Sequence, residues 1–346
     1  MKFDYCIGNP PYQADIQNEG DRANPLYDKF MDAAFEIADN VELIHPARFL
    51  FNAGQTSKAW NEKMLQDPHF KVLYHEIDSS VVFPNTDIKG GVAISYRNPK
   101  RNYGAIGTFT SYPELNGITQ KVNSMTPHGE YIDTITSSRG MYRFSDVFYT
   151  DYPNAKDLVG KGSGNMVVSN AFEKMPDVFT TDEKPESLKI LGRVGSNRTF
   201  RYVNKKYIIP NEYLSSWNVL VPEANGTGAI GEVLSTPLIG EPLIGEPLIG
   251  VTDTFISIGT FETENKAVAA LKYIKSRFAR TMLGVNKVTQ HNPKSTWKNV
   301  PLQDFSSKSD IDWSQSVAEI DRQLYKKYGL SEEEIQFIET HVKEME

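Results

Sequence analysis

The first hundred residues alternate between short apolar runs and stretches with helical periodicity, and this alternation limits the folds open to the chain. Two stretches carry apolar residues on one helical face, at 26–38 and 57–66. Strands separated by helices favour parallel pairing, with ligand sites beyond the carboxyl ends of the strands. We therefore expect an α/β fold for this part of the chain. The expected strands are residues 2–8, 41–44, 70–74 and 91–96.

The pattern changes after residue 100, where short runs rich in Ser, Thr, Gly, Tyr and Pro replace the alternation. The chain has 346 residues, and a single core seldom grows beyond about 250 to 300. We therefore expect a domain boundary between 100 and 150, followed by a β-rich part with embedded helices. Helices are expected at 264–282 and 317–328, and Ser331 with Glu334 forms a capping box that opens the last helix.

Composition excludes several classes of protein. No apolar run approaches the roughly 20 residues that a membrane-spanning helix needs, so we expect no membrane partner. The single cysteine, Cys6, cannot form an internal disulfide or a cysteine-rich zinc cluster, and we expect no metal site. The N-terminus lacks the basic and apolar regions of a secretory signal. These features together predict a cytoplasmic protein.

Charge is unevenly distributed along the chain, although the net charge is only −7. Residues 187–210 contain six basic and no acidic residues, and residues 266–298 contain eight basic and no acidic residues. Residues 304–346 contain five basic and eleven acidic residues. Basic clusters of this kind are typical of nucleic-acid binding, but they also occur on solvated faces. Charge alone leaves both interpretations open.

Two glycine-containing features lie in the second half of the chain. Residues 226–231 read Gly-Thr-Gly-Ala-Ile-Gly and mimic a dinucleotide-binding loop, but Pro237 follows too soon for the helix that such a loop opens. The sequence Pro-Leu-Ile-Gly then repeats from Pro237, Pro242 and Pro247. We interpret the repeat as an expanded turn or strand segment in a loop. The alternative is a spacer of adjustable length between recognition elements.

One motif carries chemistry: Asn9-Pro10-Pro11-Tyr12, which follows the first expected strand. The exocyclic amine of a base is a poor methyl acceptor, because its lone pair is delocalised into the ring. The amide oxygen of Asn9 and the carbonyl of Pro10 can accept from its N–H bonds and aim the lone pair at a sulfonium methyl group. The two prolines fix that carbonyl, and Tyr12 offers a stacking face for an extruded base. The alternative interpretation is a turn that only ends a strand.

With its flanking segments, the motif resembles the gamma class of N6-adenine DNA methyltransferases, the methylase part of type II restriction-modification enzymes. Residues 24–30 resemble the helix after the catalytic loop of that class, and residues 41–49 resemble its next strand and turn. The resemblance implies a partial Rossmann-like methyltransferase sheet. It also implies S-adenosylmethionine as the cofactor, with Asn9, Leu26 and Tyr27 in contact with it.

The resemblance further implies base flipping, with Phe83 and the motif tyrosine on either side of the extruded adenine. The implied catalytic residues are Asn9, Pro10, Pro11 and Tyr12. Residues 254–259, 264–282 and 300–305 resemble the target-recognition domain of the class. This implies a mixed α+β domain that binds double-stranded DNA.

Within that second domain we expect basic residues to contact phosphates, with Arg, Asn or Gln side chains reading base edges. The candidates for phosphate contact are Arg193, Arg198, Arg201, Lys272, Lys275, Arg277 and Lys287. At each position the alternative is a solvated side chain with no partner.

The chain departs from the class in one respect. The glycine-rich cofactor loop of the class precedes the catalytic motif, whereas eight residues precede Asn9. We therefore expect an incomplete S-adenosylmethionine pocket, and an open sheet edge along residues 2–8 where a cofactor-binding half would pair. The expected partner is an N-terminal methyltransferase half or a separate subunit.

Together these features predict three segments. Residues 1–105 are expected to form the C-terminal half of a methyltransferase catalytic domain, residues 106–303 a DNA target-recognition domain, and residues 304–346 a helical tail. The predicted function is site-specific adenine-N6 methylation of DNA in a restriction-modification system, without activity in this fragment alone. Two alternatives stay open: a non-catalytic DNA-recognition module, and methyl transfer to protein glutamine or RNA guanine.

Overall fold

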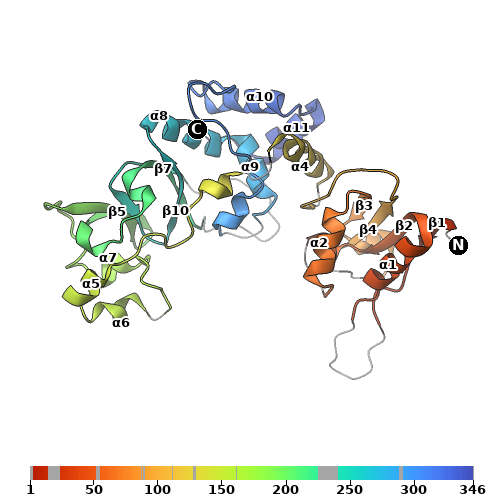
Figure 1. Cartoon of the computed structure of the whole chain (residues 1–346), viewed down its shortest axis with the longest axis horizontal. Coiled ribbons are helices and arrows are strands. Elements are labelled where there is room, and N and C mark those ends of the chain that lie inside the picture. Colours follow the sequence, from red (N-terminus) through yellow and green to blue (C-terminus); the bar gives the residue numbers. More distant parts are fainter. Residues whose placement is uncertain are drawn as a thin grey trace. The chain divides into compact units, whose positions relative to one another are not determined.

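In a computed structural model, the chain forms two compact units, residues 1–120 and 121–346 (Figure 1). Each unit has its own hydrophobic core. The helix α4 (Pro113–Met125) spans the point at which the units divide. The structure describes residues 3–14, 24–51, 55–86, 88, 90–110, 112–127, 130–160, 162–224, 241–287 and 291–345.

The first unit is built on a four-stranded sheet with the order β1-β2-β4-β3. Its strands are β1 (Phe3–Gly8), β2 (Ala38–Pro46), β3 (Phe70–Glu76) and β4 (Val92–Arg97). β1 and β2 are parallel, whereas β4 runs antiparallel to both β2 and β3. The α/β class is confirmed, but parallel pairing is wrong beyond the first pair. A short helix and a glycine turn join β3 to β4, in place of a crossover helix.

Helices cover one face of this sheet. They are α1 (Tyr27–Ile37), η1 (Arg48–Phe51) and α2 (Lys58–Gln66). A further short helix, α3 (Ser79–Val82), follows β3. α2 begins at Ser57, whose side-chain oxygen accepts the N–H of Trp60 at 3.2 Å. The core beneath the helices includes the fully buried side chains of Met31, Phe49 and Phe70. The packed face of α1 consists of Tyr27, Met31 and Ala34. The apolar face expected at 26–38 included Phe30 and Ile37, which are 44% and 46% exposed, so that expectation is correct only in part.

The β1 edge of the sheet is open. β1 pairs with β2 on one side, and its other side has no strand partner in the described part of the chain. Phe3, Tyr5 and Ile7 are 62%, 69% and 74% exposed, and they alternate along β1 with Cys6, which packs against the core. Three large exposed apolar side chains on an unpaired edge strand are typical of an association surface.

His45 is fully buried at the end of β2. Its Nε2 atom lies 2.8 Å from the Ser95 hydroxyl, and its Nδ1 atom lies 3.2 Å from the Pro46 carbonyl. The ring stacks on Tyr27, with ring centroids 6.3 Å apart and planes inclined by 12°. Burial lowers the pKa of His45 to about 4, and the Pro46 carbonyl offsets this only in part. The imidazole is therefore neutral near pH 7.

The second unit contains two three-stranded sheets, ordered β10-β7-β8 and β6-β5-β9. Their strands are β5 (Ser187–Val194), β6 (Asn197–Asn204), β7 (Trp217–Pro222), β8 (Leu243–Gly245), β9 (Ile249–Val251) and β10 (Phe255–Phe261). β5 is parallel to β9, and the other pairs are antiparallel. The short helices are η2 (Ile132–Ile135), α5 (Asp146–Asp151), α6 (Ala155–Val159), α7 (Ala171–Lys174), η3 (Lys205–Tyr207), η4 (Glu212–Ser215) and η5 (Lys294–Trp297). The mixed α+β character expected here is confirmed.

The Pro-Leu-Ile-Gly repeat contributes strands to both of these sheets. The copy beginning at Pro242 forms β8 against β7, and the copy beginning at Pro247 enters β9 against β5. Leu248 has a left-handed φ of 70°, whereas its counterpart Leu243 lies within β8, so identical copies adopt different conformations. The first copy and residues 226–231 lie outside the described residues. The strand interpretation holds for two copies, and the spacer alternative stays a prediction.

The prediction of a single helix at 264–282 is wrong. Two helices occupy this region: α8 (Glu264–Lys275) and α9 (Arg277–Gly284). Ser276 separates them with a ψ of 148°, and its hydroxyl caps α9. The Asp321 carboxylate accepts the N–H groups of the first two residues of α9, at 3.0 and 2.9 Å. A carboxylate that is far away in the sequence thus stabilises the first turn of α9. Helical periodicity does not reveal such a contact.

The acidic C-terminal segment packs on these basic helices. It forms α10 (Val317–Lys327) and α11 (Glu332–His341), and the capping box of Ser331 and Glu334 is confirmed. The segment belongs to the same compact unit as residues 121–303. No helix in the described ranges is both long and apolar enough to cross a bilayer.

The buried neutral His45 predicts a pH dependence of stability. The unfolded state binds more protons than the folded state between the folded pKa of about 4 and the ordinary value of 6.5. The free energy of unfolding should therefore fall by up to about 3 kcal/mol as the pH drops through this window. Urea denaturation at several pH values measures this. His45→Gln should flatten the dependence and His69→Gln should not, while equal slopes in all three proteins would contradict the prediction.

Candidate functional site

The motif at residues 9–12 forms the turn at the carboxyl end of β1. Because β1 is parallel to β2, both strands end on the same side of the sheet. Beyond the turn, the Leu26 N–H donates to the Tyr12 carbonyl at 3.0 Å, and the Ala14 N–H donates to the Asn24 carbonyl at 2.8 Å. These bonds hold the end of the motif against the start of α1.

The motif residues differ in exposure. The Asn9 side chain is exposed, and no hydrogen bond to it occurs within the described residues. Pro10 and Tyr12 are half-buried. Burial raises the pKa of Tyr12 to about 12, so its phenol is neutral at pH 7 and offers an uncharged aromatic face. The turn therefore presents one amide, one fixed carbonyl and one ring.

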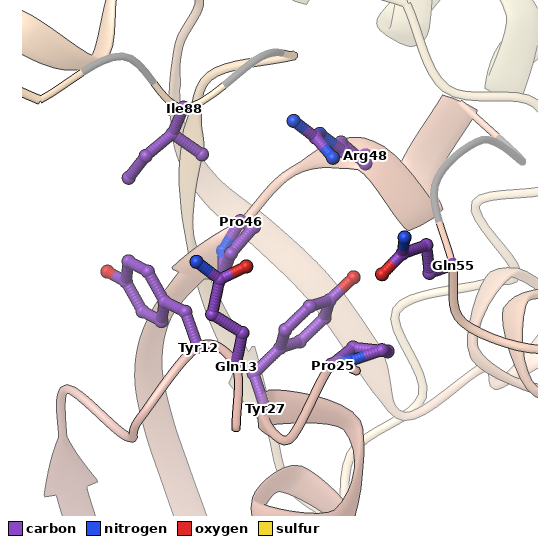
Figure 2. Close-up of a pocket in the computed structure, with 8 residues that line it drawn as sticks. All are labelled: Tyr12, Gln13, Pro25, Tyr27, Pro46, Arg48, Gln55 and Ile88. Atoms are coloured by element: carbon purple, nitrogen blue, oxygen red, sulfur yellow. The ribbon is translucent and has the colours of Figure 1, made fainter. Parts of the chain in front are cut away.

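A cavity of about 140 Å³ opens beside this turn (Figure 2). Tyr12 and Ile88 stand on one side of the opening in Figure 2, and Arg48, Tyr27 and Gln55 stand on the other. The lining residues are Tyr12, Gln13, Pro25, Tyr27, Pro46, Arg48, Gln55 and Ile88. The cavity is close to the size of one nucleobase and well below the roughly 300 Å³ at which pockets for larger ligands begin.

The two aromatic residues expected to sandwich a base do lie close together. The ring centroids of Tyr12 and Phe83 are 6.4 Å apart, but their planes are inclined by 68°. A base stacked on both faces requires nearly parallel rings. The side chains as they stand therefore form an edge-to-face pair, and Phe83 would have to rotate to complete a sandwich.

Of the residues expected to contact the cofactor, Tyr27 lines the cavity and is 5% exposed. Its ring packs against His45, Phe49 and Trp60. Leu26 joins the turn through its backbone, and the exposed side chain of Asn9 is not part of the lining. The cavity is too small for the whole of S-adenosylmethionine, so the described residues fit the cofactor only in part.

The seven candidate phosphate contacts separate into two groups. Arg193 and Arg198 are exposed and lie directly opposite one another on the β5–β6 hairpin. Lys189 and Phe200 share their face, with the Lys189 ammonium 4.5 Å from the ring centroid, and Arg201 lies on the other face. None of these cations has an ion pair within the ranges that the structure describes. Like charges directly opposite one another destabilise a hairpin unless an anion lies between them.

The helical candidates have intramolecular partners. Lys272 donates to three backbone carbonyls at residues 313–315, and Lys275 pairs with Glu241 at 2.9 Å. Arg277 bridges two carboxylates of the C-terminal segment, those of Glu339 and Glu344. Lys287 is 2% exposed and donates to the His291 carbonyl at 3.3 Å. Phosphate contact has no geometric support at Lys272, Lys275, Arg277 or Lys287.

Sequence reasoning missed several residues that line the cavity: Gln13, Arg48, Gln55 and Ile88. Gln13 directly follows the motif, and Arg48 lies within residues 41–49, which resemble the strand and turn of the methyltransferase class, so the sequence does contain a signal for both. Gln55 and Ile88 lie in loops, and no periodicity or spacing in the sequence points to them.

Comparisons with known proteins concern mainly the first unit. Residues 1–83 match the model of the Eco57I restriction-modification methylase family. A stretch of 95 residues, 27% of this chain, is 30% identical to an uncharacterized adenine-specific methylase of Mycoplasma pneumoniae and covers 22% of that protein. Among solved structures, the type IIG restriction endonuclease BpuSI aligns with 91% of this chain and 49% of its own, with a TM-score of 0.33 and 9% identity.

The match to the methylase family contains the turn at residues 9–12, the start of α1, and β2 with the Pro46-Ala47-Arg48 segment. All the residues that line the cavity except Ile88 fall within the matched range. The chain spans about a fifth of the methylase relative that it matches. Over residues 1–83, the chain is therefore similar to Eco57I-type restriction-modification methylases.

Proposed function

We propose that this chain is the catalytic and DNA-contacting component of a restriction-modification enzyme that methylates adenine at N6 in double-stranded DNA. One observation carries the proposal. The turn at residues 9–12 lies at the carboxyl end of β1 beside a cavity of about 140 Å³, within the segment that matches restriction-modification methylases. The turn supplies hydrogen-bond acceptors, and the cavity has the size of one base.

In the proposed mechanism, an adenine leaves the duplex and stacks on Tyr12, which contributes roughly 1 to 3 kcal/mol. The Asn9 amide oxygen and the Pro10 carbonyl accept from its two N–H bonds. These bonds draw the nitrogen towards tetrahedral geometry and expose its lone pair. S-adenosylmethionine, when bound, would supply the sulfonium methyl group: the bond from sulfur to the methyl carbon would break as the bond to N6 forms, and one N6 proton would pass to solvent. The neutral phenol of Tyr12 takes no proton, so its part is to hold the ring.

We assign the DNA backbone to the β5–β6 hairpin. A two-stranded ribbon fits the major groove, and phosphates would neutralise the opposed guanidinium groups of Arg193 and Arg198. Lys189 and Arg201 extend the positive charge to both faces of the hairpin. Lys205 and Lys206 pair with Glu186 and Asp151 and contribute less.

The open edge of β1 is the proposed seam with a cofactor-binding half. Tyr5 and Ile7 are more than two-thirds exposed, and the outer side of β1, which has no strand partner among the described residues, can accept a further strand. Such a strand would carry the larger part of the S-adenosylmethionine pocket, which exceeds the cavity of this chain. The second candidate function is that of a non-catalytic DNA-recognition module. The observation that favours it is that the cavity is too small to hold the whole of S-adenosylmethionine.

Replacing the amide acceptor tests the catalytic role. In cells that carry this chain, an Asn9→Ala allele should abolish N6-methyladenine at one sequence motif, since one acceptor of the amine is lost. Genome sequencing that detects modified bases measures this. Asn102→Ala, at another asparagine of the same unit, should leave the methylation unchanged. Full methylation in the Asn9→Ala strain would exclude Asn9 from catalysis and favour the recognition module.

The hairpin proposal predicts a change in the salt dependence of DNA binding. Removing two phosphate contacts with Arg193→Gln and Arg198→Gln should weaken binding on the order of tenfold near 0.1 M salt, and should lower the slope of log affinity against log salt by about 2. Fluorescence anisotropy with duplex DNA measures both quantities. The matched control is Lys206→Gln with Arg322→Gln, which removes two ion-paired cations. Equal effects in the two double variants would refute a special role for the hairpin.

Charge on the β1 edge should prevent docking of the complementary half. Tyr5→Lys with Ile7→Lys should abolish adenine methylation in cells while the circular dichroism and unfolding of the purified chain stay unchanged, because both side chains are already exposed. Ile77→Lys with Val81→Lys changes two equally exposed apolar residues elsewhere on the unit and should keep methylation. If methylation were retained in the Tyr5→Lys, Ile7→Lys variant and lost in the Ile77→Lys, Val81→Lys variant, the seam would lie elsewhere on the unit.

A further inference from the structure

Gln13 directly follows the motif at residues 9–12 and lines the cavity, and the proposed mechanism gives it no role. Its backbone lies opposite Pro25 in an antiparallel bridge, between the two hydrogen bonds that join the turn to the start of α1. In the view of Figure 2, its side-chain amide stands between the rings of Tyr12 and Tyr27. The backbone that carries this amide is therefore held on both sides, and the amide faces the cavity.

The polar groups that line the cavity differ in whether the protein already binds them. The Tyr27 hydroxyl shares a hydrogen bond with Thr56, and Arg48 also has an interaction partner. The Gln13 side chain is exposed, and it makes no hydrogen bond within the ranges that the structure describes. Gln55 is exposed as well, but it stands on the other side of the opening (Figure 2). Gln13 therefore offers an unbonded amide on the side of the catalytic turn.

The acceptors of the turn do not by themselves select adenine. The Asn9 amide oxygen and the Pro10 carbonyl accept from an exocyclic amine, and both adenine and cytosine carry one. The atom that separates these two bases is N7 of the purine ring, an acceptor beside the amine that cytosine lacks. Guanine has N7, but an oxygen replaces its amine. Among the four bases, a site that accepts from the amine and donates to N7 therefore fits adenine alone.

We propose that Gln13 selects adenine by donating a side-chain N–H to N7 of the extruded base. The inference rests on the proposed function, because it requires a base held between the Asn9 turn and Tyr12. Gln13 lies one residue beyond Tyr12 on the same turn, so its donor and the acceptors of the turn can meet one edge of the base. The amide turns its N–H towards N7, because the reverse orientation would set its oxygen against the N7 lone pair.

The test is a double-mutant cycle between Gln13 and N7. One probe is a short single-stranded oligonucleotide with one adenine among thymines, and the other carries 7-deazaadenine, in which a C–H group replaces N7. Fluorescence anisotropy measures the affinity of each probe for the full chain. Loss of N7 should weaken binding to the wild type about fivefold and binding to Gln13→Met less than twofold. Methionine keeps the length of the side chain and lacks the donor, and the exposed position tolerates it.

Gln66→Met is the matched control, since it removes an exposed glutamine of the same unit that does not line the cavity. It should retain the fivefold effect, and so should Gln55→Met. An effect that persists in Gln13→Met, or one that is absent from the wild type, would overturn the role of Gln13 and leave the proposed function intact. No preference of the wild type for the adenine probe over an all-thymine one would contradict the base pocket itself.

A probe in which cytosine replaces the adenine tests selection directly. The wild type should prefer the adenine probe, and Gln13→Met should lower the ratio of the two affinities about fivefold, because the remaining acceptors take either amine. The same anisotropy assay measures this ratio, and Gln66→Met should leave it unchanged. A ratio that is the same in Gln13→Met and in the wild type would assign the selection of adenine to another contact and overturn the proposal.

Discussion

The parallel pairing of β1 with β2 is the interaction on which the rest of the site depends. It brings the ends of two strands that are far apart in sequence to the same side of the sheet. The turn at residues 9–12 follows the end of β1, and the segment Pro46-Ala47-Arg48 follows the end of β2. The cavity lies between the two turns. His45, buried and neutral beneath them, bonds to Ser95 of β4 and stacks on Tyr27 of α1, so it joins the sheet to the helix that closes the cavity.

Much of the first unit could be predicted from local patterns. The strand at 2–8 and the helix at 26–38 appear within a residue or two of their expected bounds, because apolar periodicity and proline act over a few residues. Pairing direction could not be predicted, since it depends on where β4 inserts between β2 and β3. The split of the helix at Ser276 escaped for the same reason, because a carboxylate from residue 321 stabilises the start of α9.

Predictions made from charge are limited in the same way, because they also depend on contacts between distant residues. Residues 187–210 and 266–298 have the same kind of charge, with several basic and no acidic residues. Their surroundings differ. The helical cations contact the acidic C-terminal segment and backbone carbonyls, whereas the hairpin cations lie opposite each other or against two aromatic rings, those of Phe200 and Phe255. A count of charges along the chain therefore finds both clusters. Tertiary contacts are needed to distinguish cations that pair within the protein from cations that have no ion pair among the described residues. Arg48 was missed although it lies within residues 41–49, because a single cation after a strand stands out in neither charge nor periodicity.

The identity of the methylated product tests the central proposal most directly. Protein purified from its own cells, together with anything that stays bound to β1, is incubated with duplex DNA and S-adenosylmethionine labelled in the methyl group, and the labelled nucleoside is identified by chromatography. The geometry of the Asn9 turn and its base-sized cavity predicts N6-methyldeoxyadenosine as the labelled product. Label in a methylated cytosine, in RNA guanine or in protein glutamine, or no transfer at all, would contradict it.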